Sequence, residues 1–295
     1  MTIYSIRHVT TYRYRQPVGF ARHRMMLRPR DSHDLRLLGT RLIIDPEPTR
    51  IDWNHDTFAN SIAVASFDER ADVLRIESRL RLEHYGYSDP DLHIYPHAET
   101  WPFNYSEDER IDLAPVMAVR YPDPAGVVKN WALGFVREGD SIDTQNLLVR
   151  MAEDIRAKFP YYERVETGTQ EPAETLRKGG TCRDFANLMM EGLRALGFAA
   201  RFVSGYLYDP GLDNGTDAVG IQGAGATHAW VQVYLPGAGW IEFDPTNALY
   251  GGANLIRVAV VRHPGQAIPI DGRYIGAPDD FLSMDVEVSV EREGD

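Results

Sequence analysis

Polar and apolar residues alternate along several short stretches within the first hundred positions. These stretches are residues 3–9, 10–14, 61–67 and 73–83, to which an apolar run at 41–45 can be added. A period of two places successive side chains on opposite faces of a strand, and short strands separated by turns are typical of sandwiches. The pattern therefore predicts a β-sandwich-like N-terminal domain over residues 1–95.

Prolines interrupt the next part of the chain. They lie at positions 90, 96, 102, 115, 122 and 124. Proline lacks a backbone donor and restricts the residue before it, so residues 96–140 are predicted to form an extended, Pro-rich connection. The interleaved aromatic residues Trp101, Phe103 and Tyr105 indicate that this connection is packed against the rest of the protein.

A helical period replaces the strand period after residue 140. Helices are predicted at 144–159, which Pro160 ends, at 171–177, and at 182–196, which Gly197 ends. Strands are predicted at 200–206, 228–234, 240–244, 258–261 and 286–292. The overall prediction is an α+β protein in which residues 141–295 form a core of helices packed on an antiparallel sheet, with closing C-terminal strands.

Composition and charge narrow the possible partners. The chain has 295 residues, of which 43% are hydrophobic, and its formal net charge is -12. So acidic a chain is a poor match for nucleic acid or for an anionic membrane surface, and neither is expected as a partner. No apolar run approaches the length of a membrane span, and residues 1–15 lack a signal-peptide core. A cytoplasmic location is therefore expected, while the oligomeric state stays open.

The single cysteine occupies an unusual place. A lone cysteine, here Cys182, excludes an internal disulfide and is commonly a small buried hydrophobe. Cys182, however, follows Gly179 and Gly180 and begins a predicted helix. The positive end of a helix dipole and its free N–H groups favour a thiolate and can hold an oxyanion. This placement favours a nucleophile.

Two further residues complete a catalytic arrangement. His228 begins a predicted strand after a Gly-rich segment, and Asp244 ends the next strand. A hairpin turn joins the two strands, which places the start of the first beside the end of the second. Alone, His228 could be structural and Asp244 could be a turn residue. Together, the three residues supply a nucleophile, a base and a carboxylate that orients the base, so Cys182, His228 and Asp244 are the predicted catalytic residues.

For the other polar residues considered, no catalytic or metal-binding role is predicted. Asp184 is expected to cap or pair locally, and Asn247 to support the turn after Asp244. His93 and His97 are four residues apart, but Pro96 prevents a regular helix between them, so no metal site is predicted. No cofactor is predicted either. Residues 209–225 are expected to form a mobile surface loop that could open and close over the cleft.

Four motifs carry a family resemblance. They are Gly-Gly-Thr-Cys-Arg-Asp-Phe-Ala at 179–186, Gly-Phe-Ala-Ala-Arg-Phe-Val-Ser-Gly-Tyr at 197–206, His-Ala-Trp-Val-Gln-Val-Tyr at 228–234 and Gly-Trp-Ile-Glu-Phe-Asp-Pro-Thr-Asn at 239–247. Over residues 140–250 the chain resembles the bacterial transglutaminase-like superfamily. The stretch from Tyr12 to Arg30 resembles the N-terminal region that accompanies this core. The resemblance implies a papain-like core and the three catalytic roles above.

The resemblance leaves the reaction open. Hydrolysis of a peptide or glutamyl-type amide, with a peptide or protein amide as substrate, is the first choice. Amine transfer, as in a true transglutaminase, is the alternative within enzymes. A non-catalytic peptide-binding module that keeps the fold is the alternative outside them. The N-terminal β domain could also serve as a docking domain for a partner or substrate.

Overall fold

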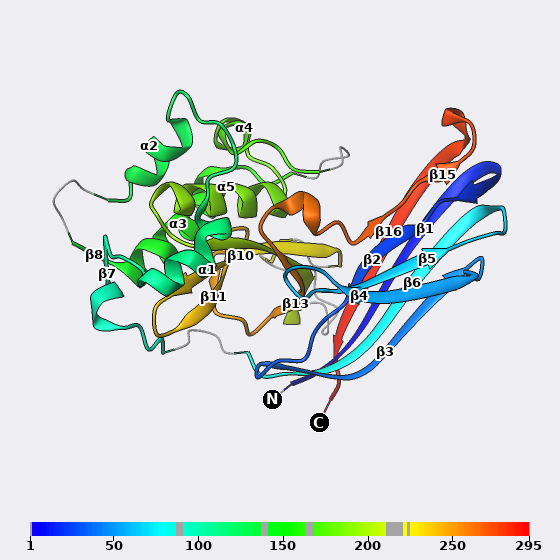
Figure 1. The fold of residues 1–295 in the computed structure, drawn as a ribbon, viewed down its shortest axis with the longest axis horizontal. Coiled ribbons are helices and arrows are strands. Elements are labelled where there is room, and N and C mark those ends of the chain that lie inside the picture. The colour runs from blue at the N-terminus through cyan, green and yellow to red at the C-terminus, as the bar shows by residue number, and fades with distance from the viewer. Residues whose placement is uncertain are drawn as a thin grey trace.

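The structure is a computed structural model that describes residues 2–86, 91–136, 141–162, 168–210, 221–222 and 225–294. Figure 1 shows a β-rich part, coloured blue, cyan and red, beside a part that combines helices with a sheet. The N-terminal strands are β1 (Thr2–Phe20), β2 (His23–Arg28), β3 (Leu35–Asp45), β4 (Arg50–His55), β5 (Ser61–Ser66) and β6 (Ala71–His84). The C-terminal strands are β14 (Ile270–Asp271), β15 (Tyr274–Ile275) and β16 (Phe281–Arg292).

Two antiparallel sheets form the β-rich part. The first, which we call the N-terminal sheet, has the order β15-β1-β6-β3, with β16 paired to β1, and the second has the order β14-β2-β5-β4. Side chains at alternate positions of the two sheets meet in a shared core that contains Tyr14, Val18, Met25, Leu74 and Ile76. Burial of such side chains contributes about 1.5–3 kcal/mol each, which holds the layers together.

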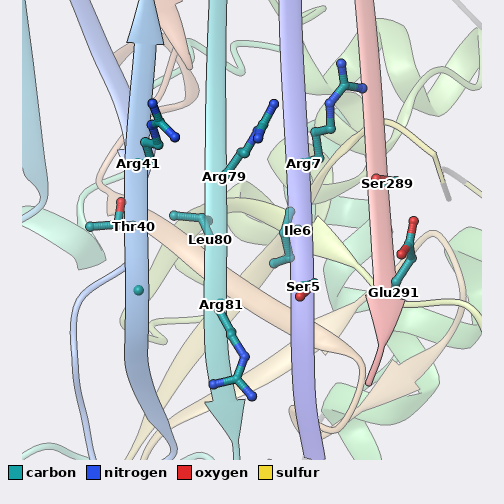
Figure 2. Close-up of a pocket in the computed structure, with 11 residues that line it drawn as sticks. Ser5, Ile6, Arg7, Thr40, Arg41, Arg79, Leu80, Arg81, Ser289 and Glu291 are labelled. Carbon is teal, nitrogen blue, oxygen red and sulfur yellow. The ribbon is translucent and has the colours of Figure 1, made fainter. Parts of the chain in front are cut away.

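A row of arginines crosses the face of the N-terminal sheet shown in Figure 2. Arg41, Arg79 and Arg7 are direct cross-strand neighbours at the wall of a groove of about 430 Å³. Like charges in such positions repel, but the buried Glu77 forms ion pairs with Arg7, Arg75 and Arg79. Burial alone would raise the pKa of Glu77, and these arginines lower it to about 2. One buried carboxylate therefore offsets the repulsion within the row.

The second part is built on a five-stranded antiparallel sheet, the core sheet. Its order is β12-β11-β10-β9-β13. These strands are β9 (Ala200–Leu207), β10 (Thr227–Leu235), β11 (Gly239–Asp244), β12 (Leu249–Tyr250) and β13 (Leu255–Val261). The helices and short strands before them are β7 (Thr100–Trp101), α1 (Glu107–Met117), α2 (Val127–Leu133), β8 (Ile142–Asp143), α3 (Thr144–Lys158), α4 (Pro172–Lys178) and α5 (Cys182–Ala195).

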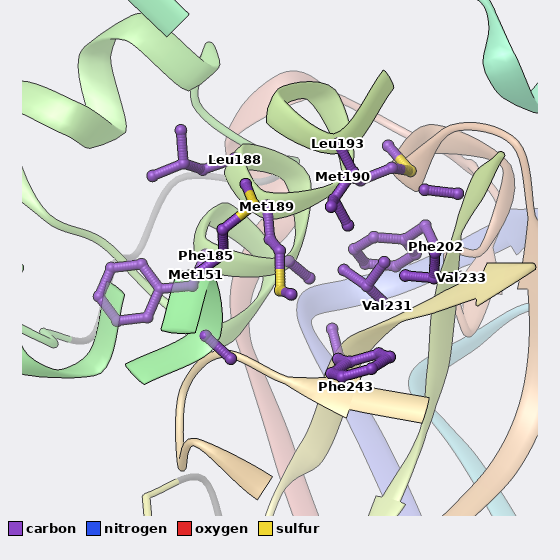
Figure 3. Packing of buried hydrophobic residues seen from close by; sticks show 14 of the residues in the cluster. Met151, Phe185, Leu188, Met189, Met190, Leu193, Phe202, Val231, Val233 and Phe243 are labelled. Atoms are coloured by element: carbon purple, nitrogen blue, oxygen red, sulfur yellow. The ribbon is translucent and has the colours of Figure 1, made fainter. Parts of the chain in front are cut away.

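Helix α5 packs on one face of the core sheet and anchors the second hydrophobic core. Phe185 and Met189 of α5 belong to the same buried cluster as Val231 and Phe243 of the sheet, and Figure 3 shows part of this cluster. All four side chains are at most 1% exposed, because the apolar positions of α5 repeat every three or four residues. This packing fixes the start of α5, where Cys182 lies.

The fold class agrees with the sequence prediction, whereas residues 96–140 and strand β16 differ from it. The α+β class with a β-rich N-terminal part is confirmed. The prediction that residues 96–140 are extended is wrong, because they contain α1 and α2. Ser106 and Glu109 cap α1 reciprocally, and the Asp123 carboxylate accepts hydrogen bonds from three N–H groups at the start of α2. Helix capping therefore outweighs the prolines here.

Strand β16 is the second departure. Residues 286–292 were expected to close the core, but β16 pairs along β1, and Val288 and Val290 pack with Tyr4 and Ile6. Their alternation fits any half-buried strand, so the pattern alone does not select the partner strand. Strand β13, in contrast, joins the core sheet beside β9, as expected. Within the described residues, no helix combines the length and the apolar character needed to cross a membrane.

Candidate active site

Helix α5 begins at Cys182 in a tightly constrained turn. Gly179 has a φ of 80°, and a Cβ there would lie 2.1 Å from the Pro160 carbonyl oxygen, so only glycine fits. The Gly180 N–H donates to the same oxygen at 3.1 Å. The preceding glycines thus let the chain pass close to Pro160 and deliver Cys182 to the first position of the helix.

Asp184 holds this helix start in place. Its carboxylate accepts hydrogen bonds from the N–H and Oγ1 of Thr181, both at 2.9 Å, and from the N–H of Gln170 at 2.7 Å. Asp184 is fully buried, so these bonds form away from competing water. The predicted local role of Asp184 is therefore what the structure shows, and Asp184 positions the turn that carries Cys182.

His228 and Asp244 meet across the β10–β11 hairpin. The strands pair with Val231 opposite Phe243, which brings the start of β10 beside the end of β11. His228 Nε2 and Asp244 Oδ2 are 2.8 Å apart, and both side chains have no solvent exposure. The Asp244 carboxylate also accepts hydrogen bonds from Asn247 Nδ2 at 2.8 Å and from the Thr246 N–H at 2.9 Å. The carboxylate is thus fixed on several sides.

The two partners shift each other's ionisation. Burial by itself lowers the pKa of His228, but the Asp244 carboxylate and the nearby Cys182 thiol together raise it to about 10. Burial alone would raise the pKa of Asp244, but His228 and the two donors after it lower that pKa. The stable state of this pair at neutral pH is therefore an imidazolium beside a carboxylate.

The free nitrogen of the imidazole is Nδ1. Asp244 occupies Nε2, whereas Nδ1 is buried and has no hydrogen-bond partner among the described residues. Cys182 is 7% exposed and close enough to influence the ring. Nδ1 is therefore the atom that can exchange a proton with the thiol or with a bound substrate.

A polar network, partly buried, extends from the Trp230 ring that stacks on the imidazole. The ring of Trp230 stacks on that of His228, with centroids 6.0 Å apart and planes inclined by 25°. Trp230 Nε1 donates to Glu242, which also accepts from Arg257 at 2.9 Å. Arg257 then forms a second ion pair with Asp34 at 2.8 Å. The network therefore links His228 to the β-rich part of the molecule.

Gly205 makes room for this stack. It lies opposite His228 in the β9–β10 register, and a Cβ there would lie 2.7 Å from the Trp230 ring and 2.1 Å from a backbone oxygen. A side chain at this position would displace Trp230. The glycine before Tyr206 in the second motif, residues 197–206, therefore has a packing reason beside the proposed active site.

The structure brings together the three residues that the sequence singled out, and adds neighbours that it did not. Asn247 supports Asp244 directly, as suggested. Glu242, Arg257 and Asp34 were missed, because ordinary charged residues give no signal in the sequence for a partner as far as 223 positions away. Most of the segment 209–225, predicted to form a mobile surface loop, lies outside the described residues. His93 and His97 belong to no metal-type cluster in the part of the chain that the structure describes.

Comparison with known proteins adds an independent result. Residues 4–83 match the family described as the bacterial transglutaminase-like N-terminal region, and residues 134–245 match the transglutaminase-like superfamily. The uncharacterized protein Rv2569c of Mycobacterium tuberculosis is 30% identical over 315 residues, which cover 99% of this chain and 94% of that protein. The uncharacterized protein ML0607 of Mycobacterium leprae is 37% identical over 110 residues, or 37% of each chain.

One solved structure shares the fold over nearly the whole length. It is the crystal structure of a protein from Cytophaga hutchinsonii that carries the name "putative cysteine protease". The TM-score is 0.69, with 17% sequence identity, and the superposition covers 98% of this chain and 90% of that one. At this identity the similarity establishes the common fold.

Proposed function

Because this chain belongs to the transglutaminase-like superfamily, a family of cysteine-dependent enzymes, we propose that it transfers acyl groups through a thioester on Cys182. We further propose that water is the usual acceptor, so that the net reaction is hydrolysis of a peptide or glutamyl-type amide. One observation carries the proposal: a buried imidazole, held by Asp244 through Nε2, lies close enough to the Cys182 thiol at a helix start for that thiol to raise its pKa.

The reaction begins with a proton on His228 and a thiolate on Cys182. The thiolate attacks the carbonyl carbon, a C–S bond forms, and the carbonyl oxygen becomes an oxyanion. Backbone N–H groups at the start of α5, which have no intrahelical acceptor, are positioned to stabilise that charge. His228 Nδ1 then donates its proton to the departing nitrogen, and the C–N bond breaks. An amine leaves and the thioester remains.

Resolution of the thioester runs through the same atoms. A water molecule gives a proton to His228 Nδ1 while its oxygen attacks the acyl carbon. The C–S bond breaks, the acid leaves, and the thiolate–imidazolium pair is restored. Asp244 keeps the ring oriented in both halves of the cycle. A primary amine in place of water would give the transglutaminase reaction, which is the alternative.

Choice of acceptor is a matter for direct measurement. The sequence lacks an Asp-x-Asp-x-Asp-Gly calcium loop of the kind that could gate cross-linking activity, and this favours water. We would incubate the protein with a blocked glutaminyl peptide, with and without hydroxylamine. Ammonia and free acid under both conditions support hydrolysis, whereas a hydroxamate product shows amine transfer.

Thiol reactivity separates an enzyme from a binding module without knowledge of the substrate. Cys182 is the single cysteine, so alkylation by iodoacetamide reports on it alone. At about pH 6 we expect His228→Gln to slow alkylation by about 10²-fold or more, because the imidazolium no longer stabilises the thiolate. The matched control is His97→Gln at the surface, which should leave the rate unchanged. Equal rates in wild type and His228→Gln would favour the binding-module alternative.

A further inference from the structure

A second cavity lies at the other end of β10 from the catalytic histidine. Its volume is about 660 Å³, within the range of small-molecule sites. Tyr234, on its wall, is six positions from His228, which corresponds to about 20 Å along a strand. Its apolar lining comes from Phe58, Leu113, Val116, Tyr234 and Trp240. The cavity is therefore separate from the proposed active site.

One cationic side chain at this wall has no acidic partner. Arg201 lies opposite Gln232 in the sheet, and its Nε donates to Gln232 Oε1 at 2.7 Å. Its guanidinium carbon lies 3.9 Å above the Trp240 ring. Among the described residues, Arg201 forms no ion pair, and no acceptor binds its two terminal nitrogens. A half-buried guanidinium without a carboxylate is uncommon, because removal of its hydration is costly.

Neighbouring positive charges further disfavour the unpaired cation of Arg201. Burial is the main cause that lowers the pKa of Arg201 to about 10, and Arg257 and Arg30 lower it further, while only Glu242 opposes them. Arg262 also lines the cavity and has no ion pair in the described part of the chain. An anion near Arg201 would therefore meet a guanidinium group without an ion pair among the described residues, with a second, Arg262, in the same lining.

Acidic residues of α1 limit how much negative charge a ligand can bring. Helix α1 contributes Glu109, which accepts a hydrogen bond from the Tyr234 hydroxyl at 3.2 Å, and the exposed Asp112. These carboxylates would repel a multiply charged anion such as phosphate. The apolar lining residues Leu113 and Val116, on the same helix, instead suit a ligand body without charge.

We propose that this cavity binds a small monocarboxylate with an aromatic or apolar body. The carboxylate accepts two hydrogen bonds from the terminal nitrogens of Arg201, in the paired geometry that guanidinium groups favour. The body of the ligand packs against Leu113, Val116 and Tyr234. The inference does not depend on the chemistry at Cys182, since neither Cys182 nor His228 lines the cavity.

Calorimetric titration of the full chain with benzoate and with benzamide tests the charge requirement. The two probes have nearly the same shape and differ in the carboxylate. We expect saturable binding of benzoate and at least about tenfold weaker binding of benzamide. Equal binding of the two would overturn the role of Arg201. Tighter binding of inorganic phosphate than of benzoate would show a simple anion site and overturn the ligand class.

A pair of variants locates the site. Arg201→Gln should weaken benzoate binding by at least about tenfold. Arg41→Gln removes the same charge from the N-terminal sheet, where Arg41 has no ion pair among the described residues, and should bind benzoate as wild type does. Unchanged affinity in a folded Arg201→Gln protein would place the binding elsewhere and refute the proposal. The benzoate–benzamide contrast in wild type decides the charge requirement even if that variant does not fold.

Discussion

Two buried histidines, one in each part of the molecule, have pKa values shifted in opposite directions. His8 lies on β1 at the contact with the core sheet, where its ring nitrogens bond Tyr206 Oη at 3.0 Å and Thr10 Oγ1 at 3.2 Å. His228 lies on β10 against Asp244. Burial lowers the pKa of His8 to about 4, whereas the pKa of His228 is raised to about 10. Both rings are at most 2% exposed, so the carboxylate, and not the extent of burial, makes the difference.

This contrast separates a structural from a chemical use of histidine. Hydroxyl partners form hydrogen bonds with both nitrogens of a neutral ring and leave it uncharged at neutral pH. This suits a residue buried at the contact between two sheets. A buried carboxylate keeps the imidazole protonated at neutral pH, which suits a group that transfers protons. Removing or replacing these hydrogen-bond partners should therefore shift the pKa of one histidine toward that of the other.

Asp244→Asn should have the largest effect, because it leaves burial as the dominant influence on His228. The folded pKa of His228 lies above its unfolded value of 6.5. The stabilisation that the protonated His228 gives the folded state is therefore complete below pH 6.5, and it is lost as pH rises through about 10. The pKa of Asp244 is lowered, so its contribution also requires a pH above its unfolded value of 3.8. Within that window we expect the free energy of unfolding to fall by about 3–5 kcal/mol.

Urea denaturation at about pH 5.5 and about pH 9.5 measures this effect, and the loss should be smaller at the higher pH. The control is Glu293→Gln, which removes a surface carboxylate bound to Arg81 and should leave the midpoint unchanged at both pH values. A loss in Asp244→Asn that is the same at both pH values would mean that the ion pair does not carry the stability.

His8 should produce the opposite pH dependence. Its folded pKa lies below the unfolded value of 6.5, so the unfolded chain takes up a proton first as the pH falls. The stability from the neutral ring is complete above pH 6.5 and is lost as pH falls toward about 4, by about 3 kcal/mol. In His8→Gln, whose amide can still bond Tyr206 and Thr10, the decline of the unfolding free energy between these pH values should be smaller by that amount. An unchanged decline would assign the acid sensitivity to other groups.

Tyr206→Phe should have the smallest effect of the three. The substitution removes the hydroxyl that bonds His8 and keeps the ring, which is 1% exposed, in place. We expect a loss of about 1 kcal/mol in the free energy of unfolding. The rate of Cys182 alkylation should not change, because Tyr206 does not contact His228 through any hydrogen bond in the described residues. A slower alkylation rate would show that the contact between His8 and Tyr206 is coupled to the proposed active site.

Local sequence determined much of the candidate site. Gly179 and Gly180 before Cys182 encode a tight turn into a helix, and this signal is complete within a few residues. The hairpin that joins β10 and β11 is equally local, since a short turn fixes the register that brings His228 to Asp244. The α+β class also follows from the change of hydrophobic period near residue 140. Each of these features depends on neighbours in sequence, which is why they could be predicted.

Tertiary structure alone decided which distant elements pair. The sequence of β16 specifies a half-buried strand, but its place beside β1, across more than 260 residues, follows from which surface was left to cover. Asp34, Arg257 and Glu242 look like ordinary charged residues in the sequence, and only folding joins them into one network beside Trp230. Arg201 likewise loses its hydration only when α1 and the core sheet enclose a cavity. Burial changes the ionisation of a group through the low-dielectric surroundings and the partners it meets, and both are properties of the folded chain.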